Sequence, residues 1–92
     1  MDFEWDPKKA IANFARHGVS FEEAATVFDD PRGAPFYDPD HSDDEDRFIL
    51  FGASSHGTLM MVAHTERGER VRIISARRLT REERMRYEED SD

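Results

Sequence analysis

The sequence predicts an α+β domain, with a mainly antiparallel four-stranded sheet in the order β-α-α-β-β-β-α and two helices packed on one face. Three observations lead to this prediction. Two capping boxes and one Asp-Pro pair mark the starts of three helices, near residues 6, 20 and 80. Three apolar runs joined by short glycine-bearing turns predict a meander over 47–77. The 92 residues are enough for one modest hydrophobic core, so we expect a single domain over 1–92.

A short strand and a helix are predicted at the start of the chain. Phe-Glu-Trp at 3–5 alternates apolar and polar residues, which favours a strand. Asp6 can cap a helix and Pro7 suits its first position, so a helix is expected over about 8–17. Gly18 is placed to end this helix in a left-handed conformation.

The first two helices are predicted to carry apolar faces. In the first helix, Ile11, Phe14 and Ala15 recur at helical spacing. The capping box at 20–23 then begins a second helix over about 21–28. Its core-facing side would consist of Phe21, Ala24, Ala25, Val27 and Phe28.

The segment Pro31 to Asp46 is rich in proline, glycine and aspartate, and it is predicted to be a loop, which is long for so small a domain. The acidic end of this loop invites a calcium interpretation. It lacks the ligand spacing and the glycine of an EF-hand loop, so no metal site is predicted.

The second half of the chain is predicted to hold three strands and a helix. The strands are expected over 47–54, 58–67 and 69–77. Their centres are apolar on both alternating faces, so helices should cover at least one face of the meander. A third helix over about 81–89 has few apolar residues, so its docking should be marginal, and the acidic tail over about 88–92 is expected to be disordered.

The charge of the chain is unevenly distributed. The formal net charge is −8, but Arg67 to Arg86 holds eight of the thirteen Lys and Arg residues. Such a cluster can bind phosphate or carboxylate, or it can be a solvated face paired with nearby acids. The overall acidity argues against indiscriminate nucleic-acid binding. No run approaches the roughly 20 apolar residues of a membrane span, and no signal peptide is evident, so a cytoplasmic location without membrane contact is expected.

An ordered set of motifs resembles one known family. The set consists of Phe3-Glu4-Trp5-Asp6, Lys9, Asn13, His17-Gly18-Val19-Ser20-Phe21, Val27-Phe28-Asp29-Asp30-Pro31, Glu45, Arg47, Gly52, Thr65, Arg67, Arg72-Ile73-Ile74-Ser75-Ala76-Arg77, Glu83-Arg84 and Tyr87. Nearly end to end, the chain resembles the BrnT family of bacterial toxins, which share a RelE-like ribonuclease fold.

The resemblance implies a toxin of a type II toxin–antitoxin system. Such a toxin would be an endoribonuclease that cleaves mRNA without a metal ion or other cofactor. Its expected partner is a BrnA-like ribbon-helix-helix antitoxin, in a heterotetramer, with promoter DNA bound only through the antitoxin. The alternative is an inactive BrnT-like protein that acts with the antitoxin in transcriptional autoregulation.

Cleavage of RNA by its own 2′-hydroxyl needs a proton acceptor, a proton donor and cations that stabilise the phosphorane. The candidate catalytic residues are His17, Glu45, Arg47, Arg72 and Arg77. The candidate RNA-binding or phosphate-binding residues are Lys9, Arg67, Ser75, Arg81 and Tyr87.

For the two arginines of the last predicted strand, two arrangements are open. Arg72 and Arg77 are five residues apart, so strict alternation would place them on opposite faces. A bulge or the end of the strand near 75–76 would instead bring both to one cleft. The structural alternative for Arg72 is an ion pair with Glu45 or an aspartate.

The other candidates have simpler alternatives. His17 suits acid–base chemistry, but it also suits a helix end before a glycine. Glu45 and Arg47 lie two residues apart, and they are either a base and a phosphate ligand or an ion pair that anchors the loop. Lys9 can be merely solvated, and Tyr87 can pack on the sheet instead of stacking on a base.

Overall fold

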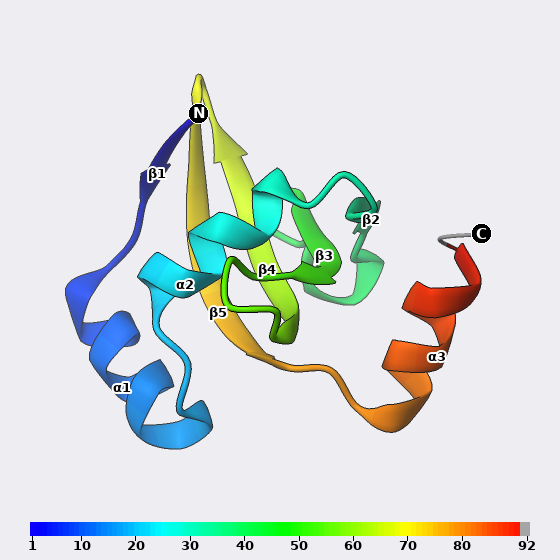
Figure 1. Ribbon diagram of the computed structural model, residues 1–92. Coiled ribbons are helices and arrows are strands. Elements are labelled where there is room, and N and C mark those ends of the chain that lie inside the picture. The colour runs from blue at the N-terminus through cyan, green and yellow to red at the C-terminus, as the bar shows by residue number, and fades with distance from the viewer. Residues whose placement is uncertain (91–92) are drawn as a thin grey trace.

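Residues 1–90, which the computed structural model describes, form a five-stranded sheet in the order β1-β5-β4-β3-β2 with three α-helices (Figure 1). The strands are β1 (Asp2–Glu4), β2 (Ala34–Tyr37), β3 (Arg47–Ala53), β4 (Leu59–Arg67) and β5 (Arg70–Arg78). The helices are α1 (Pro7–His17), α2 (Phe21–Thr26) and α3 (Arg81–Asp90), with 3₁₀ turns η1 (Val27–Asp29) and η2 (Pro39–His41). Only the β1–β5 pair is parallel, so the predicted α+β class with a mainly antiparallel sheet is confirmed.

The local signals for the first two helices act as predicted. The Asp6 carboxylate accepts a hydrogen bond from the Lys8 backbone N–H at 2.9 Å. Gly18 has φ +72°, a conformation that glycine adopts without steric penalty, and it ends α1. The Ser20 hydroxyl accepts from the Glu23 backbone N–H at 3.0 Å and begins α2.

The prediction of a four-stranded sheet is wrong, because the expected loop over 31–46 contains β2. This strand pairs antiparallel with β3, and all four of its residues are exposed. An edge strand of this kind shows no alternation of buried and exposed residues, and it tolerates Pro35, which has no N–H to donate. Contact of the Phe36 ring with Phe51, at 5.3 Å between centroids, helps to hold it in place.

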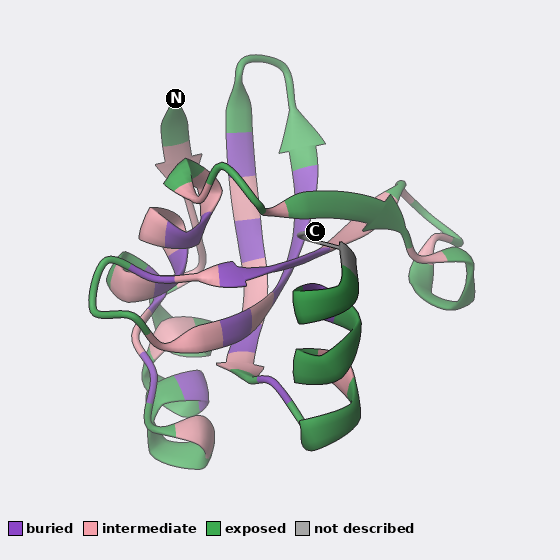
Figure 2. Ribbon diagram, turned by 45° about the vertical axis from the view of Figure 1, so that its right-hand side comes forward, coloured by how far each residue is buried: buried purple, intermediate pink, exposed green. Residues whose placement is uncertain are grey.

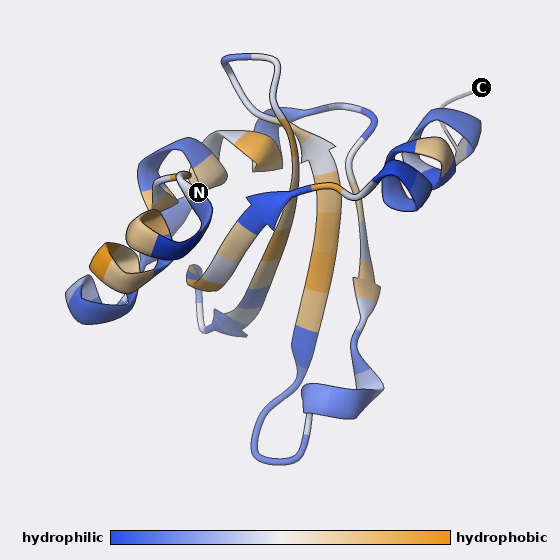
Figure 3. Ribbon diagram, turned by 90° about the horizontal axis from the view of Figure 1, so that it is seen from below, coloured by the Kyte–Doolittle hydropathy of each residue, from blue (hydrophilic) through white to orange (hydrophobic). Residues whose placement is uncertain are grey.

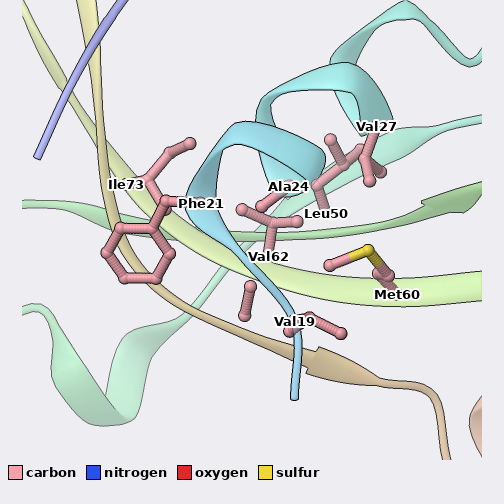
Figure 4. Packing of buried hydrophobic residues seen from close by; sticks show 9 residues of the cluster. Val19, Phe21, Ala24, Val27, Leu50, Met60, Val62 and Ile73 are labelled. Carbon is pink, nitrogen blue, oxygen red and sulfur yellow. The ribbon is translucent and has the colours of Figure 1, made fainter. Parts of the chain in front are cut away.

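The main core lies between α2 and one face of the sheet (Figure 4). Phe21, Met60 and Val62 are completely buried there. The cluster as a whole comprises Val19, Phe21, Ala24, Val27, Leu50, Met60, Val62, Ile73 and Ala76. The predicted core-facing side of the second helix is therefore confirmed for its buried members.

The apolar face predicted for α1 does not pack into the core. Ile11 and Phe14 remain 72% and 58% exposed, and Figure 3 shows hydrophobic positions in the ribbon of α1. The buried side chain is Asn13, whose amide donates to the carbonyls of Val19 and Ala76 at 3.2 and 2.9 Å and accepts from the Ala76 N–H at 3.1 Å. β1 covers only the beginning of β5, so the later backbone groups of β5 need other hydrogen-bond partners. The bonds with Ala76 meet this need and hold the Asn13 side chain inward.

A β-bulge interrupts the pairing of β4 with β5. Ile73 lies opposite His64 and Ser75 lies opposite Ala63, so Ile74 has no partner. Beyond the bulge, side chains of β5 change their alternation relative to β4.

The second face of the sheet, opposite α2, is partly covered by α3. Tyr87, and Leu79 just before the helix, are buried against Phe51, while most of α3 is exposed (Figure 2). The apolar contact is small, as the sequence predicted. Residues 88–90, which were assigned to a disordered tail, instead continue α3, and residues 91–92 lie outside the described part of the chain. None of the helices in residues 1–90 is long and apolar enough to cross a bilayer.

Candidate functional site

The second face of the sheet carries a set of polar side chains that we call the arginine face. It consists of Arg47, Arg67, Arg70, Arg72, Ser75 and Arg77. Arg72 lies opposite Thr65 and Arg77 lies opposite Met61, and these two partners are four residues apart on β4. Side chains four apart on a strand share a face, so the bulge at Ile74 brings both arginines to one side of the sheet. The arrangement suits the binding of phosphate.

Arg72 is held by the N-terminal strand. Its guanidinium donates to a Glu4 carboxylate oxygen at 2.7 Å, and both side chains are a little over one quarter exposed, at 29% and 27%. The parallel register of β1 places Glu4 directly beside Arg72. An ion pair therefore forms, although not with Glu45 or an aspartate. One bond uses only part of the five N–H donors of a guanidinium, so Arg72 keeps donors for a ligand.

Arg77 is held more completely. Its two terminal nitrogens donate to the two carboxylate oxygens of Glu83 at 2.8 and 3.0 Å. Glu83 also accepts from the Thr80 backbone N–H and donates its own backbone N–H to the Thr80 hydroxyl. The hydrogen bond from Arg77 is the main cause that lowers the pKa of Glu83 to about 2, and it raises the pKa of Arg77. Such a weakly basic carboxylate positions Arg77 and the start of α3 but is a poor proton acceptor.

Acid is expected to loosen α3. The pKa of Glu83 is 4.5 without these interactions and about 2 in the folded protein. Because the folded pKa is the lower one, the stabilisation is fully present above pH 4.5 and disappears as the pH falls towards 2. Amide hydrogen-exchange protection factors in α3, measured against those of β4, should fall over this window.

The control for this experiment is Glu83→Gln, in which the group no longer titrates. In that variant α3 should be weakly protected at every pH in the window. An α3 that keeps its protection relative to β4 in acid would contradict the anchoring role of Glu83.

Glu45, Arg47 and Arg67 meet at the end of the arginine face near the acidic loop. Arg67 donates to Glu45 at 3.1 Å in an exposed ion pair. No ion pair joins Glu45 to Arg47 among residues 1–89, although both line a shallow hollow of about 270 Å³ with Asp40, His41, Asp43 and Asp44. The expected Glu45–Arg47 ion pair is therefore wrong, and Glu45 is paired with Arg67 instead. The surrounding carboxylates make Arg47 a weaker candidate for binding phosphate.

Three other candidates lie on helices and not on the strands of the arginine face. His17 is half-buried at the end of α1, and the described residues include no hydrogen bond or ion pair between it and an arginine. Lys9 is exposed on α1 and Arg81 is exposed in the first turn of α3. A second histidine, His64, is buried between the rings of Phe28 and Phe48, and burial lowers its pKa, which indicates a structural role.

Tyr87 packs on the sheet, which was the alternative to stacking on an RNA base. Its hydroxyl donates to Asp30 at 2.6 Å, and burial with this bond raises the pKa of Tyr87 to about 12. Asp30 also accepts from the backbone N–H groups of Ala53 and Arg32 at 2.7 and 2.9 Å. Burial alone would raise the pKa of Asp30, but the three hydrogen bonds hold it below its usual value. Asp30 therefore ties η1, β3 and α3 together.

Glu4 and Asp30 belong to the motifs that resemble the family, but the sequence assigned neither of them a role in the site. Glu4 reaches Arg72 through a pairing of strands 68 positions apart, which no local pattern reveals. Asp30 acts through bonds to Ala53 and Tyr87, which are 23 and 57 positions away, and no local pattern reveals them. Glu83 was visible as part of a capping box, but its bond to Arg77 depends on how α3 returns to the sheet.

The geometry describes a small α+β domain with arginines on an open sheet face. The chain is similar in fold to the ribonuclease toxin BrnT of Brucella abortus, whose crystal structure is known at 1.1 Å resolution. The TM-score is 0.65 at 23% sequence identity, over 88% of this chain and 99% of the other. No curated protein sequence matches significantly.

A family model gives the more specific result. The model for the ribonuclease toxin BrnT of type II toxin–antitoxin systems matches residues 5–83. The chain belongs to the BrnT family.

Proposed function

We propose that the protein is an active RelE-like toxin, an endoribonuclease that cleaves mRNA without a metal ion and that a BrnA-like ribbon-helix-helix antitoxin neutralises. The observation that carries the proposal is the bulge at Ile74, which brings Arg72 and Arg77 to one face of the sheet. Membership of the ribonuclease toxin family supports the same activity.

Arg72 is the best candidate for stabilising the phosphorane. It lies on β5 between β1 and β4, where a strand holds side chains more rigidly than a loop, and it is partly exposed. A cation in this position would stabilise the extra negative charge of the transition state. Arg77, held by Glu83, and the exposed Arg67 would bind neighbouring phosphates.

Glu4 is the carboxylate with which Arg72 forms an ion pair. At 2.7 Å from that guanidinium, it would lie next to any phosphate bound by Arg72. We therefore assign Glu4 the candidate role of proton acceptor from the 2′-hydroxyl. His17 and Glu45 remain candidates from the sequence, and neither is in contact with Arg72 among the described residues.

The activity is tested with purified protein free of antitoxin. Incubation with single-stranded RNA in EDTA should yield fragments with 2′,3′-cyclic phosphate ends, identified by mass spectrometry, because the 2′-hydroxyl attacks the adjacent phosphorus. The Arg72→Ala protein, purified in the same way, controls for contaminating nuclease. Equal cleavage by both preparations, or none by the wild type, would reject the proposed activity.

A second candidate function is a non-catalytic partner of the antitoxin in transcriptional autoregulation. It is favoured by the two ion pairs on the arginine face, because Glu4 and Glu83 already neutralise Arg72 and Arg77. The exposed Ile11 and Phe14 on α1 support a protein partner in either case, since exposed apolar patches usually mark interaction surfaces. A heterotetramer with the antitoxin, which alone contacts promoter DNA, fits both functions.

A further inference from the structure

We propose that the pocket between β2 and α3 binds one nucleotide of single-stranded RNA, with its base on Phe36 and its phosphate on Arg86 or Arg32. The inference rests on the proposed function, since it assigns this pocket to the RNA strand that crosses the arginine face. The pocket has a volume of about 200 Å³ and is lined by Arg32, Phe36, Phe51, Arg86 and Tyr87, among others.

The floor of the pocket is aromatic. The rings of Phe36 and Phe51 meet edge to face at 5.3 Å, and the Arg86 guanidinium lies 5.8 and 5.9 Å from their centroids. Phe36 is 40% exposed although it is a large apolar side chain. An exposed ring beside a guanidinium is a surface on which a nucleobase can stack.

The two arginines of the pocket form no ion pair with a carboxylate within the described part of the chain. Among the side chains of residues 1–89, no ion pair involves Arg32 or Arg86. Asp30 is close to Arg32, but its carboxylate already accepts hydrogen bonds from Tyr87 and two backbone N–H groups. In a chain with 21 acidic and 13 basic residues, two arginines at one pocket that form no ion pair among the described side chains can bind an anion.

The position of the pocket fits a strand of RNA that also reaches Arg72. Phe36 lies opposite Ile49, Ile49 opposite Ala63, and Ala63 opposite Ser75, so Phe36 and the arginine face are on the same side of the sheet. Three strand spacings separate β2 from β5, about 14 Å in total. The pocket is smaller than those for drug-sized ligands, and a single planar base suits it. A base that is paired within a duplex cannot enter, so the site selects single-stranded RNA.

The chain supplies matched variants for a binding test. Phe36→Ala removes the ring on which the base would stack, and Arg86→Gln removes a guanidinium that would bind the phosphate. Tyr37→Ala removes the neighbouring ring of β2, which is 49% exposed on the other face, and Arg84→Gln removes an exposed cation of α3. The probe is a fluorescent 2′-O-methyl RNA oligonucleotide, which cannot be cleaved by 2′-hydroxyl attack. Its anisotropy reports binding, and circular dichroism reports folding.

Phe36→Ala is expected to weaken binding by about 5- to 100-fold, the range for loss of one stacked base. Arg86→Gln should weaken it more than Arg84→Gln, and Tyr37→Ala should bind like the wild type. Wild-type affinity in folded Phe36→Ala and Arg86→Gln would overturn the proposal. So would full displacement of the oligonucleotide by a polyglutamate peptide at equal concentration, since the pocket would then fit an acidic protein segment.

Together, the binding and cleavage results distinguish a failure of the proposed pocket from a failure of the proposed ribonuclease activity. RNA cleavage by the wild type together with unchanged binding in both pocket variants would reject the pocket and leave the proposed ribonuclease intact. Pocket-dependent binding without any cleavage would support the pocket and reject the ribonuclease.

Discussion

Substitution of Arg72 by alanine is expected to slow single-turnover cleavage of RNA by about 10²–10³-fold, the usual loss when one group that stabilises transition-state charge is removed. The fold should survive. Arg72 and Glu4 are both partly exposed, so water can solvate Glu4 once its partner is gone. The measurement is the cleavage rate at saturating RNA, with circular dichroism as the check on folding.

Arg78→Ala is the matched control for this prediction. Arg78 is an exposed arginine of the same strand, but it lies opposite Met60 and therefore on the other face of the sheet. The Arg78→Ala protein should cleave RNA at nearly the wild-type rate, although it has the same net charge as the Arg72→Ala protein. Equal losses in the two variants would point to a general charge effect, and full activity in folded Arg72→Ala would reject the proposed activity, because the cleavage would then be that of a contaminating nuclease. Arg77→Ala is less informative, because it also releases Glu83 and α3.

Gly52→Ala is expected to destabilise the protein by about 2–3 kcal/mol, at the upper end of overpacking effects. A Cβ at this position would lie 2.8 Å from a methyl group of Val27 and 3.1 Å from the Asp30 carboxylate. The φ of Gly52 is not positive, so the effect is steric and not one of backbone conformation. Urea denaturation of the wild type and the variant measures the free energy of unfolding.

A double-mutant cycle with Val27→Ala tests the cause. Truncation of Val27 leaves a cavity by itself, but it makes room for the new Cβ. The double variant should therefore be more stable than the sum of the two single losses, by about 1 kcal/mol. Additive losses would show that the contact with Val27 is not the origin of the strain.

The sequence predicts the elements whose signals are local. Asp6, Gly18 and Ser20 mark helix ends through bonds within three or four residues, and the structure shows those caps. The meander of β3, β4 and β5 is equally legible, because its apolar runs and glycine turns are adjacent in the chain. β2 could not be identified, because its four exposed residues and its proline resemble a loop until β3 is beside them.

The candidate site was less predictable because its geometry depends on long-range register. Alternation placed Arg72 and Arg77 on opposite faces, and only a bulge, whose position depends on the pairing with β4, reverses that result. The partner of Arg72 is set by a parallel strand at the other end of the chain. The pocket at Phe36 could not be predicted either, because β2, which forms one side of it, resembles a loop in the sequence.

Two stretches along the sides of the sheet limit how another protein can bind. Where β5 extends beyond its pairing with β1, the Asn13 amide occupies both the N–H and the carbonyl of Ala76, as an additional strand would. On the β2 edge, Pro35 has no N–H to offer. An incoming strand would therefore find no free ladder groups at Ala76 and no donor at Pro35. At these two places, a partner that inhibits this protein is expected to use side-chain contacts to its faces and helices rather than to extend the sheet.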